Sequence, residues 1–144
     1  MSRTGFVICY AGCPIFWLSK LQSEVALSTT EAEYIGLSQS LRDVIPLLNI
    51  IAELQQVFIF PTHQAPLSCS LFEDNAGALA LALDHKTRPR TKHIGLKYHH
   101  FRSHVTSGLI KIFSISTFDQ VADIFTKPLP AVTFIYLRQK LMGW

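Results

Sequence analysis

The sequence predicts an α/β protein in which helices flank a mixed β-sheet. Short runs rich in aromatic and β-branched residues, such as "GFVICY" and "LIKIFSI", are typical of strands. Between them lie stretches whose apolar residues recur at helical spacing. Of the 144 residues, 49% are hydrophobic and 16% charged, which is typical of a single globular domain with a real core.

The elements are expected in the order β-β-α-β-α-α-β-α, followed by a closing helix in the tail. A hairpin pairs residues 5–10 with 15–19 across a glycine-containing loop. After a long helix, "LSCSLF" predicts a strand, "AGALALAL" a helix, and "HIGLKYHHFRSHV" a helix that ends at Ser107-Gly108. "LIKIFSI" predicts the last strand, "DQVADIFTK" a short helix and "VTFIYLRQKLMGW" a closing amphipathic helix. The sheet is mixed because the first two strands pair antiparallel, whereas later strands need helical crossovers.

The start of the long helix has two alternative registers. Ser28 and Glu31 have the spacing of a capping box, in which each residue satisfies a free backbone donor. Thr30 and Glu33 have the same spacing, so the cap is defined only to within two residues. Further along, Pro46 lacks a backbone donor and clashes with the preceding turn, so we expect a kink or a break there.

The sequence argues against several classes of protein. No apolar run reaches the ~18 residues that a membrane span needs, and no basic segment followed by an apolar one begins the chain. The three cysteines, Cys9, Cys13 and Cys69, follow no metal-ligand pattern. We therefore expect reduced thiols in an intracellular protein.

Basic residues gather in one segment of the chain. Seven of the thirteen Lys and Arg residues and five of the six histidines lie between His85 and Lys111. Such a segment is typical of a surface that binds a polyanion. On charge alone, a solvated helix face beside a loop explains it equally well.

Aspartates follow the predicted strand and begin the last short helix. Asp74 comes directly after an apolar strand, where an α/β sheet presents ligands, although it would also serve as N-cap of the next helix. Glu73 is expected to point to the opposite side, because side chains alternate along a strand. Asp119 is the natural N-cap of the short helix, which leaves Asp123, one turn later, free to act as a ligand.

Three motifs, "LSTTEAEY", "TKHI" and "ADIFTKPL", occur in this order along the chain, together with "FEDNAGALALA". In combination they resemble the ribonuclease H domain at the C-terminal end of copia-type retrotransposon Pol polyproteins. The resemblance covers essentially the whole chain. It implies a ribonuclease H-like fold over residues 1–130, with residues 131–144 as the C-terminal tail helix of the polyprotein.

The resemblance assigns three carboxylates to the active site. Glu33 matches the glutamate of the first helix, Asp74 the aspartate after the strand that precedes the second helix, and Asp123 the aspartate of the last helix. In this family such residues bind two Mg²⁺ ions, for which Mn²⁺ is a substitute. The implied reaction is hydrolysis of the RNA strand of an RNA–DNA hybrid, leaving 5′-phosphate and 3′-hydroxyl ends.

The resemblance also implies the partners of the domain. They are the RNA–DNA hybrid and the reverse transcriptase domain of the same polyprotein, with no membrane and no small-molecule substrate. The expected location is the cytoplasmic virus-like particle of the intact element, with passage to the nucleus. Because a hybrid is bound by its shape, phosphate contacts are needed rather than base contacts. The residues that we assign to these contacts are Lys86, Arg88, Arg90, Lys92, His93 and Lys97. For His93, a place in the core is an equally good interpretation.

One departure from the family pattern is large. The leading catalytic aspartate of the family lies on a first strand, which comes before the segment where this sequence begins, and no acidic residue precedes Glu24. That strand is the expected middle of a five-stranded sheet, between the hairpin and "LSCSLF". We therefore expect the first, central strand to be missing and the isolated chain to be a poorly active fragment. Direct pairing of residues 5–10 with 67–72 would mean that the sheet has closed over the gap.

Three functions are compatible with the fold class. The first is a ribonuclease H domain that removes template RNA during reverse transcription. The second is a truncated, catalytically inactive remnant that binds nucleic acid, which the missing aspartate favours for the isolated chain. A transposase or integrase of the same fold superfamily is disfavoured, because "ADIFTKPL" does not belong to its acidic signature.

Overall fold

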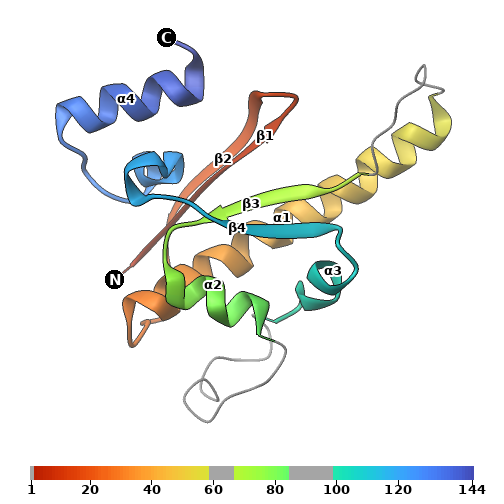
Figure 1. Ribbon diagram of the computed structural model, residues 1–144, viewed down its shortest axis with the longest axis horizontal. Coiled ribbons are helices and arrows are strands. Elements are labelled where there is room, and N and C mark those ends of the chain that lie inside the picture. The colour runs from red at the N-terminus through yellow and green to blue at the C-terminus, as the bar shows by residue number, and fades with distance from the viewer. Residues whose placement is uncertain (1, 59–66, 85–98) are drawn as a thin grey trace.

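The computed structural model describes residues 2–58, 67–84 and 99–144, in which two small sheets lie against one long helix (Figure 1). The predicted element order is observed, except that the last short helix is replaced by two 3₁₀ turns. The elements are β1 Arg3–Tyr10, β2 Cys13–Leu21, α1 Thr29–Val57, β3 Cys69–Glu73, α2 Ala76–Leu83, α3 Arg102–Thr106, β4 Ile110–Ser114, η3 Thr117–Asp119, η4 Val121–Phe125 and α4 Ala131–Met142.

The N-terminal hairpin forms as predicted and is longer than predicted. β1 and β2 pair antiparallel from Arg3 opposite Leu21 to Tyr10 opposite Cys13, with a bulge at Ile8/Cys9. Ala11 and Gly12 make the turn with φ of 50° and 79°, and glycine adopts such positive values without steric cost.

Helix α1 is one uninterrupted helix of 29 residues. Ser28 is its N-cap and accepts a hydrogen bond from the backbone N–H of Glu31, which settles the register of the cap. The expected break at Pro46 does not occur. The residues around it, Val44 and Leu48, are buried in the core, so packing outweighs the one missing hydrogen bond.

The core lies between α1 and the β3–β4 pair. β3 and β4 pair in parallel, with Cys69 opposite Ile110 and Glu73 opposite Ser114, and the crossover between them runs through α2 and α3. Tyr34 and Leu41 of α1 are fully buried against this pair and its helices. The part of the predicted helix "HIGLKYHHFRSHV" that falls on residues 93–98 lies outside the described residues.

The described strands form two separate two-stranded sheets rather than one mixed sheet. β1 pairs with β2 and β3 pairs with β4, and no β1–β3 ladder occurs among the described residues. The hairpin therefore does not close onto the β3–β4 pair. The described residues thus form a mixed α/β protein with two small sheets and helices.

The C-terminal segment differs from the sequence prediction in its details. The stretch predicted as one short helix forms η3 and η4, two 3₁₀ turns capped by Ser116 and Gln120. Asp119 is thus not an N-cap, and the prediction that Asp123 follows it by one turn of the same helix is wrong, because the two residues lie in separate 3₁₀ turns. The closing helix α4 forms as predicted and ends at Gly143, whose φ is 80°. None of the helices in the described ranges is long and apolar enough to cross a membrane.

Candidate functional site

A groove separates the two sheets. It has a volume of about 510 Å³ and runs between β1 on one side and residues 67–74 on the other. Its floor is α1, which contributes apolar side chains such as Leu37, Val44 and Leu48. We call this feature the inter-sheet groove.

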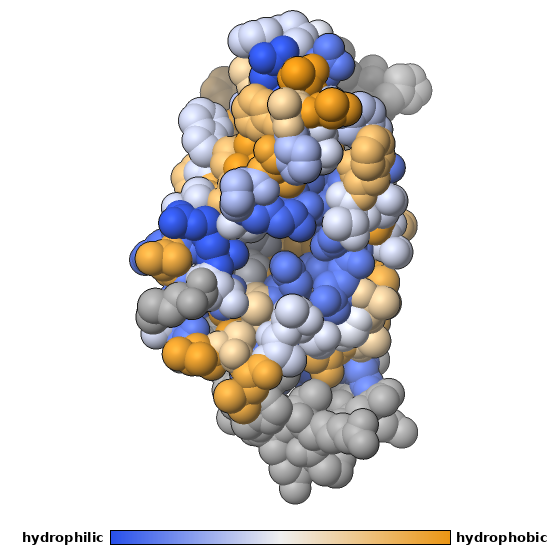
Figure 2. Space-filling model, turned by 90° about the vertical axis from the view of Figure 1, so that its left-hand side faces the viewer, coloured by the Kyte–Doolittle hydropathy of each residue, from blue (hydrophilic) through white to orange (hydrophobic). Residues whose placement is uncertain are grey.

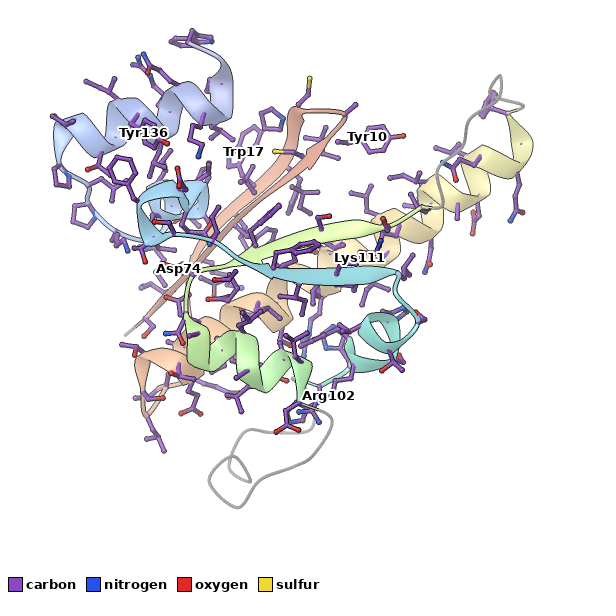
Figure 3. All side chains as sticks on the ribbon, viewed as in Figure 1. Tyr10, Trp17, Asp74, Arg102, Lys111 and Tyr136 are labelled. Atoms are coloured by element: carbon purple, nitrogen blue, oxygen red, sulfur yellow. The ribbon has the colours of Figure 1, made fainter. Side chains whose placement is uncertain are left out.

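Carboxylates gather at one end of the inter-sheet groove. The residues that line it include Glu33 of α1, Glu73 at the end of β3, Asp74 after it and Asp123 of η4. Figure 3 shows Asp74 where β3 leads into α2. On that side of the molecule, Figure 2 shows hydrophilic residues around a hollow. The three carboxylates singled out by sequence thus line one groove from three different elements.

The two glutamates at the start of α1 have different surroundings. Glu31 serves the cap: its Oε2 accepts a hydrogen bond of 2.8 Å from the backbone N–H of Leu27. Glu33, two positions later, faces the groove. Burial raises the pKa of Glu33, and the negative charges of Asp74 and Asp123 raise it further, opposed by Lys127. Glu33 is therefore close enough to both aspartates to sense their charge.

Asp74 is free of the capping role that was its alternative. The N-cap of α2 is Asn75, whose Oδ1 accepts a hydrogen bond of 2.9 Å from the backbone N–H of Ala78. The Asn75 Oδ1 also accepts a bond from the hydroxyl of Thr30. Asn75 thus links α2 to the start of α1. Because Asn75 caps α2, the Asp74 side chain is not needed for capping and lines the groove.

Asp123 is held near the groove by the 3₁₀ turn η4 and by an ion pair. It is buried, and its Oδ2 lies 2.7 Å from Nζ of Lys127. η4 itself packs closely against β1: a Cβ on Gly5 would lie 2.6 Å from Thr126 Cγ2 and 2.8 Å from Phe125 Cβ. Glycine at this strand position therefore sets how near Asp123 comes to the sheet.

Glu73 belongs to this acidic group, so the prediction that it points to the side opposite Asp74 is wrong. It is buried and shares its strand face with Cys69 and Leu71, toward α1. Burial raises the pKa of Glu73 to about 7, the nearby Glu33 and Asp74 raise it as well, and a hydrogen bond from the Asn75 N–H lowers it. The strand ends at Glu73, so alternation does not carry on to separate it from Asp74. The apolar alternation of Cys69 and Leu71 was the signal that places Glu73 on the inner face.

The carboxylates at the end of the groove are suitable ligands for a hard cation, but they lie too far apart in this conformation to bind one together. Carboxylate oxygens are the ligands that Mg²⁺ prefers. Within residues 2–58, 67–84 and 99–144, however, no three Asp, Glu, His or Cys side chains are grouped closely enough to hold a metal ion. Asp123 is moreover paired with Lys127. In this conformation the carboxylates surround the end of the groove without converging.

The residues assigned to nucleic-acid contacts lie outside the described residues. They are Lys86, Arg88, Arg90, Lys92, His93 and Lys97. Their role remains a prediction from the sequence.

Comparison with known proteins gives relatives that are transposon polyproteins. The chain is 35% identical over 141 residues to the "Retrovirus-related Pol polyprotein from transposon RE2" of Arabidopsis thaliana, covering 98% of this chain and 9% of that protein. It is 37% identical over 142 residues to the corresponding polyprotein from transposon TNT 1-94 of Nicotiana tabacum, covering 99% and 10%. The Ty1-DR5 Gag-Pol polyprotein of Saccharomyces cerevisiae is 29% identical over 140 residues, which cover 96% of this chain and 8% of that one.

The match extends over the whole chain but over a small share of each relative, at most about a tenth. No family model matches the sequence. No solved structure matches it either. Over nearly its entire length, the chain is homologous to a segment of about 140 residues of retrotransposon Pol polyproteins.

Proposed function

We propose that the chain is part of the ribonuclease H domain of a copia-type retrotransposon Pol polyprotein. In this proposal it hydrolyses the RNA strand of RNA–DNA hybrids during reverse transcription. The observation that carries the proposal is the position of Glu33, Asp74 and Asp123. These three residues were chosen from sequence motifs, and they line one end of a single groove, with both aspartates close enough to act on the pKa of Glu33.

The proposed cofactor is a pair of Mg²⁺ ions, with Mn²⁺ as a substitute, held by Glu33, Asp74 and Asp123. Two such ions would supply an activated water and a counter-charge for the leaving oxygen. The carboxylates must first converge, and Lys127 must release Asp123. Burial and, to a smaller extent, the negative charges of Asp74 and Asp123 raise the pKa of Glu33, and a divalent cation would offset those charges.

The proposed partners follow from the same assignment. The hybrid would contact the basic segment through its phosphates, and the reverse transcriptase domain of the polyprotein would deliver it. The proposed location is that of the element's virus-like particle. Because the chain corresponds to about a tenth or less of its relatives, these partners are features of the whole polyprotein.

The two glutamates of α1 provide a matched test. A chain extended at its N-terminus by the preceding strand and turn of the polyprotein is mixed with a labelled RNA–DNA hybrid and Mg²⁺. Cleavage is expected in the parent and in Glu31→Gln, and is expected to be lost in Glu33→Gln. Equal loss in both variants would overturn the assignment of Glu33, because Glu31 is the glutamate that accepts the hydrogen bond from the Leu27 N–H at the helix start.

A second function, a non-catalytic remnant that binds nucleic acid, is favoured by one observation. In the described residues the carboxylates do not form a metal-binding group. The extended chain separates the two functions. A chain that binds the hybrid and never cleaves it, with Mg²⁺ or Mn²⁺ present, would establish the remnant and refute the nuclease.

A further inference from the structure

One face of the β3–β4 pair packs on the core, and the other face is open. Side chains alternate along a strand, so the residues next to the buried isoleucines of β4 point away from the core. On this side, Ser70 lies opposite Lys111, and Phe72 lies opposite Phe113. All four side chains are exposed. We call these four residues the outer face of the β3–β4 pair.

Two phenylalanine rings lie side by side on the outer face. Their centres are 5.8 Å apart, and their planes are inclined by 30°. Phe72 is 52% exposed and Phe113 is 44% exposed, so a large part of each side chain remains open to a ligand. A ligand that covers these rings would remove apolar surface from water, which the fold itself does not achieve. The aromatic pair is therefore a candidate binding surface.

The charge of the outer face is positive. Lys111 is its one charged residue, and Figure 3 shows its place on β4. Among the described residues, no carboxylate forms an ion pair with Lys111. An aromatic pair beside an unpaired cation is complementary to an anionic ligand that carries planar groups.

Two rings and a cation suit unpaired nucleotides better than they suit a protein. Aromatic side chains on a sheet surface stack the bases of single-stranded nucleic acids, and nearby cations contact the phosphates. A specific protein interface takes roughly 20–30 residues a side, whereas the outer face has four. A duplex keeps its bases inside the stack, where the rings cannot reach them. The outer face therefore favours a single strand.

The outer face lies close to the candidate carboxylates. Asp74 comes two positions after Phe72, which places their Cα atoms roughly 7 Å apart if the chain stays extended. Phe72 also contributes to the lining of the inter-sheet groove. Hydrolysis of the RNA strand, the reaction proposed above, leaves the complementary DNA strand unpaired. A single DNA strand would thus be produced beside the outer face.

From these observations we infer that the outer face of the β3–β4 pair binds unpaired DNA, the single strand that the proposed reaction releases. Phe72 and Phe113 stack on bases of the strand, and Lys111 contacts a phosphate. The identity of the ligand as DNA rests on the proposed function, whereas the binding itself stands on the aromatic pair and its cation. The site accepts any base sequence, because every base has a face that can stack.

The test measures binding of the chain to a fluorescein-labelled oligothymidylate of about 12 nucleotides, which is within the usual site size of such surfaces. Fluorescence anisotropy is recorded at low salt with a chelator present, so that binding is measured without hydrolysis. The matched ligand is an abasic oligomer with the same label and the same number of phosphates. We expect saturable binding of the oligothymidylate and at least about fivefold weaker binding of the abasic oligomer, because stacking on the rings is lost.

Variants of the chain separate the two rings from other exposed apolar surface. Phe72→Leu and Phe113→Leu are each expected to weaken binding at least about fivefold, whereas Phe72→Tyr keeps a ring and should bind like the parent. Trp17→Leu is the control, because Trp17 is 60% exposed and lies on the other sheet. It should leave the affinity unchanged. Lys111→Gln is expected to reduce the slope of log affinity against log salt concentration by about one. Circular dichroism checks that each variant is folded, and the comparison of the two ligands needs no variant.

The outcomes that contradict the inference are distinct from those that contradict the nuclease. Equal affinity of the abasic oligomer would show binding through phosphates alone. A loss in Trp17→Leu as large as in Phe72→Leu would place the strand away from the outer face. Self-association of the parent chain that Phe72→Leu abolishes would make a second copy the occupant. Binding at the outer face without any hybrid cleavage by the N-terminally extended chain would refute the proposed nuclease and leave the single-strand site intact.

Discussion

The carboxylates that line the inter-sheet groove have contrasting surroundings. Asp119 accepts hydrogen bonds from the Tyr136 hydroxyl and from Lys140, each of 2.6 Å, and these bonds lower its pKa. Glu33 and Glu73 instead have raised pKa values, because they are buried and lie near other acids. Asp119 thus links η3 to α4 through two hydrogen bonds to its carboxylate. Glu33 and Glu73 lie among carboxylates whose negative charges raise their pKa values, and a bound cation would stabilise their ionised forms.

The largest expected effect separates Asp123 from Asp119 in the nuclease assay. In the N-terminally extended chain, Asp123→Asn is expected to lower the rate of hybrid cleavage at least about 100-fold, since a charge that would hold Mg²⁺ is removed. Asp119→Asn should keep most of the rate, because that side chain contacts α4. Rates are measured on a labelled hybrid under single-turnover conditions. A comparable loss of rate in both variants would contradict the different roles given to Asp123 and Asp119.

The second effect concerns the contact that holds η4, and with it Asp123, against β1. Gly5→Ala is expected to destabilise the chain by about 1–3 kcal/mol, because its Cβ would clash with Phe125 and Thr126. Gly36→Ala is the matched control. Its Cβ would lie 3.8 Å from the nearest Thr4 atom, and alanine favours a helix by up to about 1 kcal/mol. Urea unfolding measures both, and a Gly5→Ala chain as stable as the parent would contradict the close packing of η4.

The third effect is the pH dependence that Glu73 confers. Since its pKa is raised from 4.5 to about 7 in the folded chain, ionisation of Glu73 destabilises the fold. The penalty is absent below pH 4.5, grows between pH 4.5 and 7, and is complete above pH 7. Glu73→Gln keeps the acceptor for the Asn75 N–H and removes the charge. It should be more stable than the parent by about 3 kcal/mol at pH 8 and equally stable at pH 4.

Thermal unfolding across this range measures the difference between the two chains. A constant difference from pH 4 to pH 8 would mean that Glu73 is not held in the buried, acidic surroundings of the groove.

The smallest expected effect is on stability, when the ion pair between Asp119 and Lys140 is lost. Asp119→Asn keeps an acceptor for Tyr136 and loses the charge that pairs with Lys140 on an exposed surface. Such exposed ion pairs contribute little and are screened by salt. We expect a change in melting temperature that is small at low salt and disappears at high salt. A large change that persists in high salt would mean that Asp119 is more than a surface contact.

Much of the fold was predictable because its signals are local. The hairpin follows from two β-rich runs around a glycine turn, and α1 from its apolar spacing and the Ser28 cap. The prediction failed at Pro46 and at Asp119, where tertiary contacts decide. Core packing on both sides of Pro46 keeps α1 continuous, and the bonds from α4 give Asp119 a role that no neighbouring residue indicates.

The role of the candidate site residues stays a prediction, and the shape of the groove that they line could not be predicted from the sequence. Sequence motifs selected Glu33, Asp74 and Asp123, and all three line the groove. Glu73 was expected on the opposite side, because the end of β3 at that residue is not visible in the local pattern. The spacing between the carboxylates depends on how two sheets are placed on α1, which is a long-range property that no short motif contains.

The most direct test of the proposed active site is cleavage at defined ends by the N-terminally extended chain. The RNA strand of an RNA–DNA hybrid is incubated with Mg²⁺, and the product ends are identified. We predict products with 5′-phosphate and 3′-hydroxyl ends for the parent, no cleavage without a divalent cation, and none by Asp74→Asn. Undiminished cleavage by Asp74→Asn, or by the parent in the presence of a chelator, would contradict the assignment of these carboxylates as the metal-binding active site.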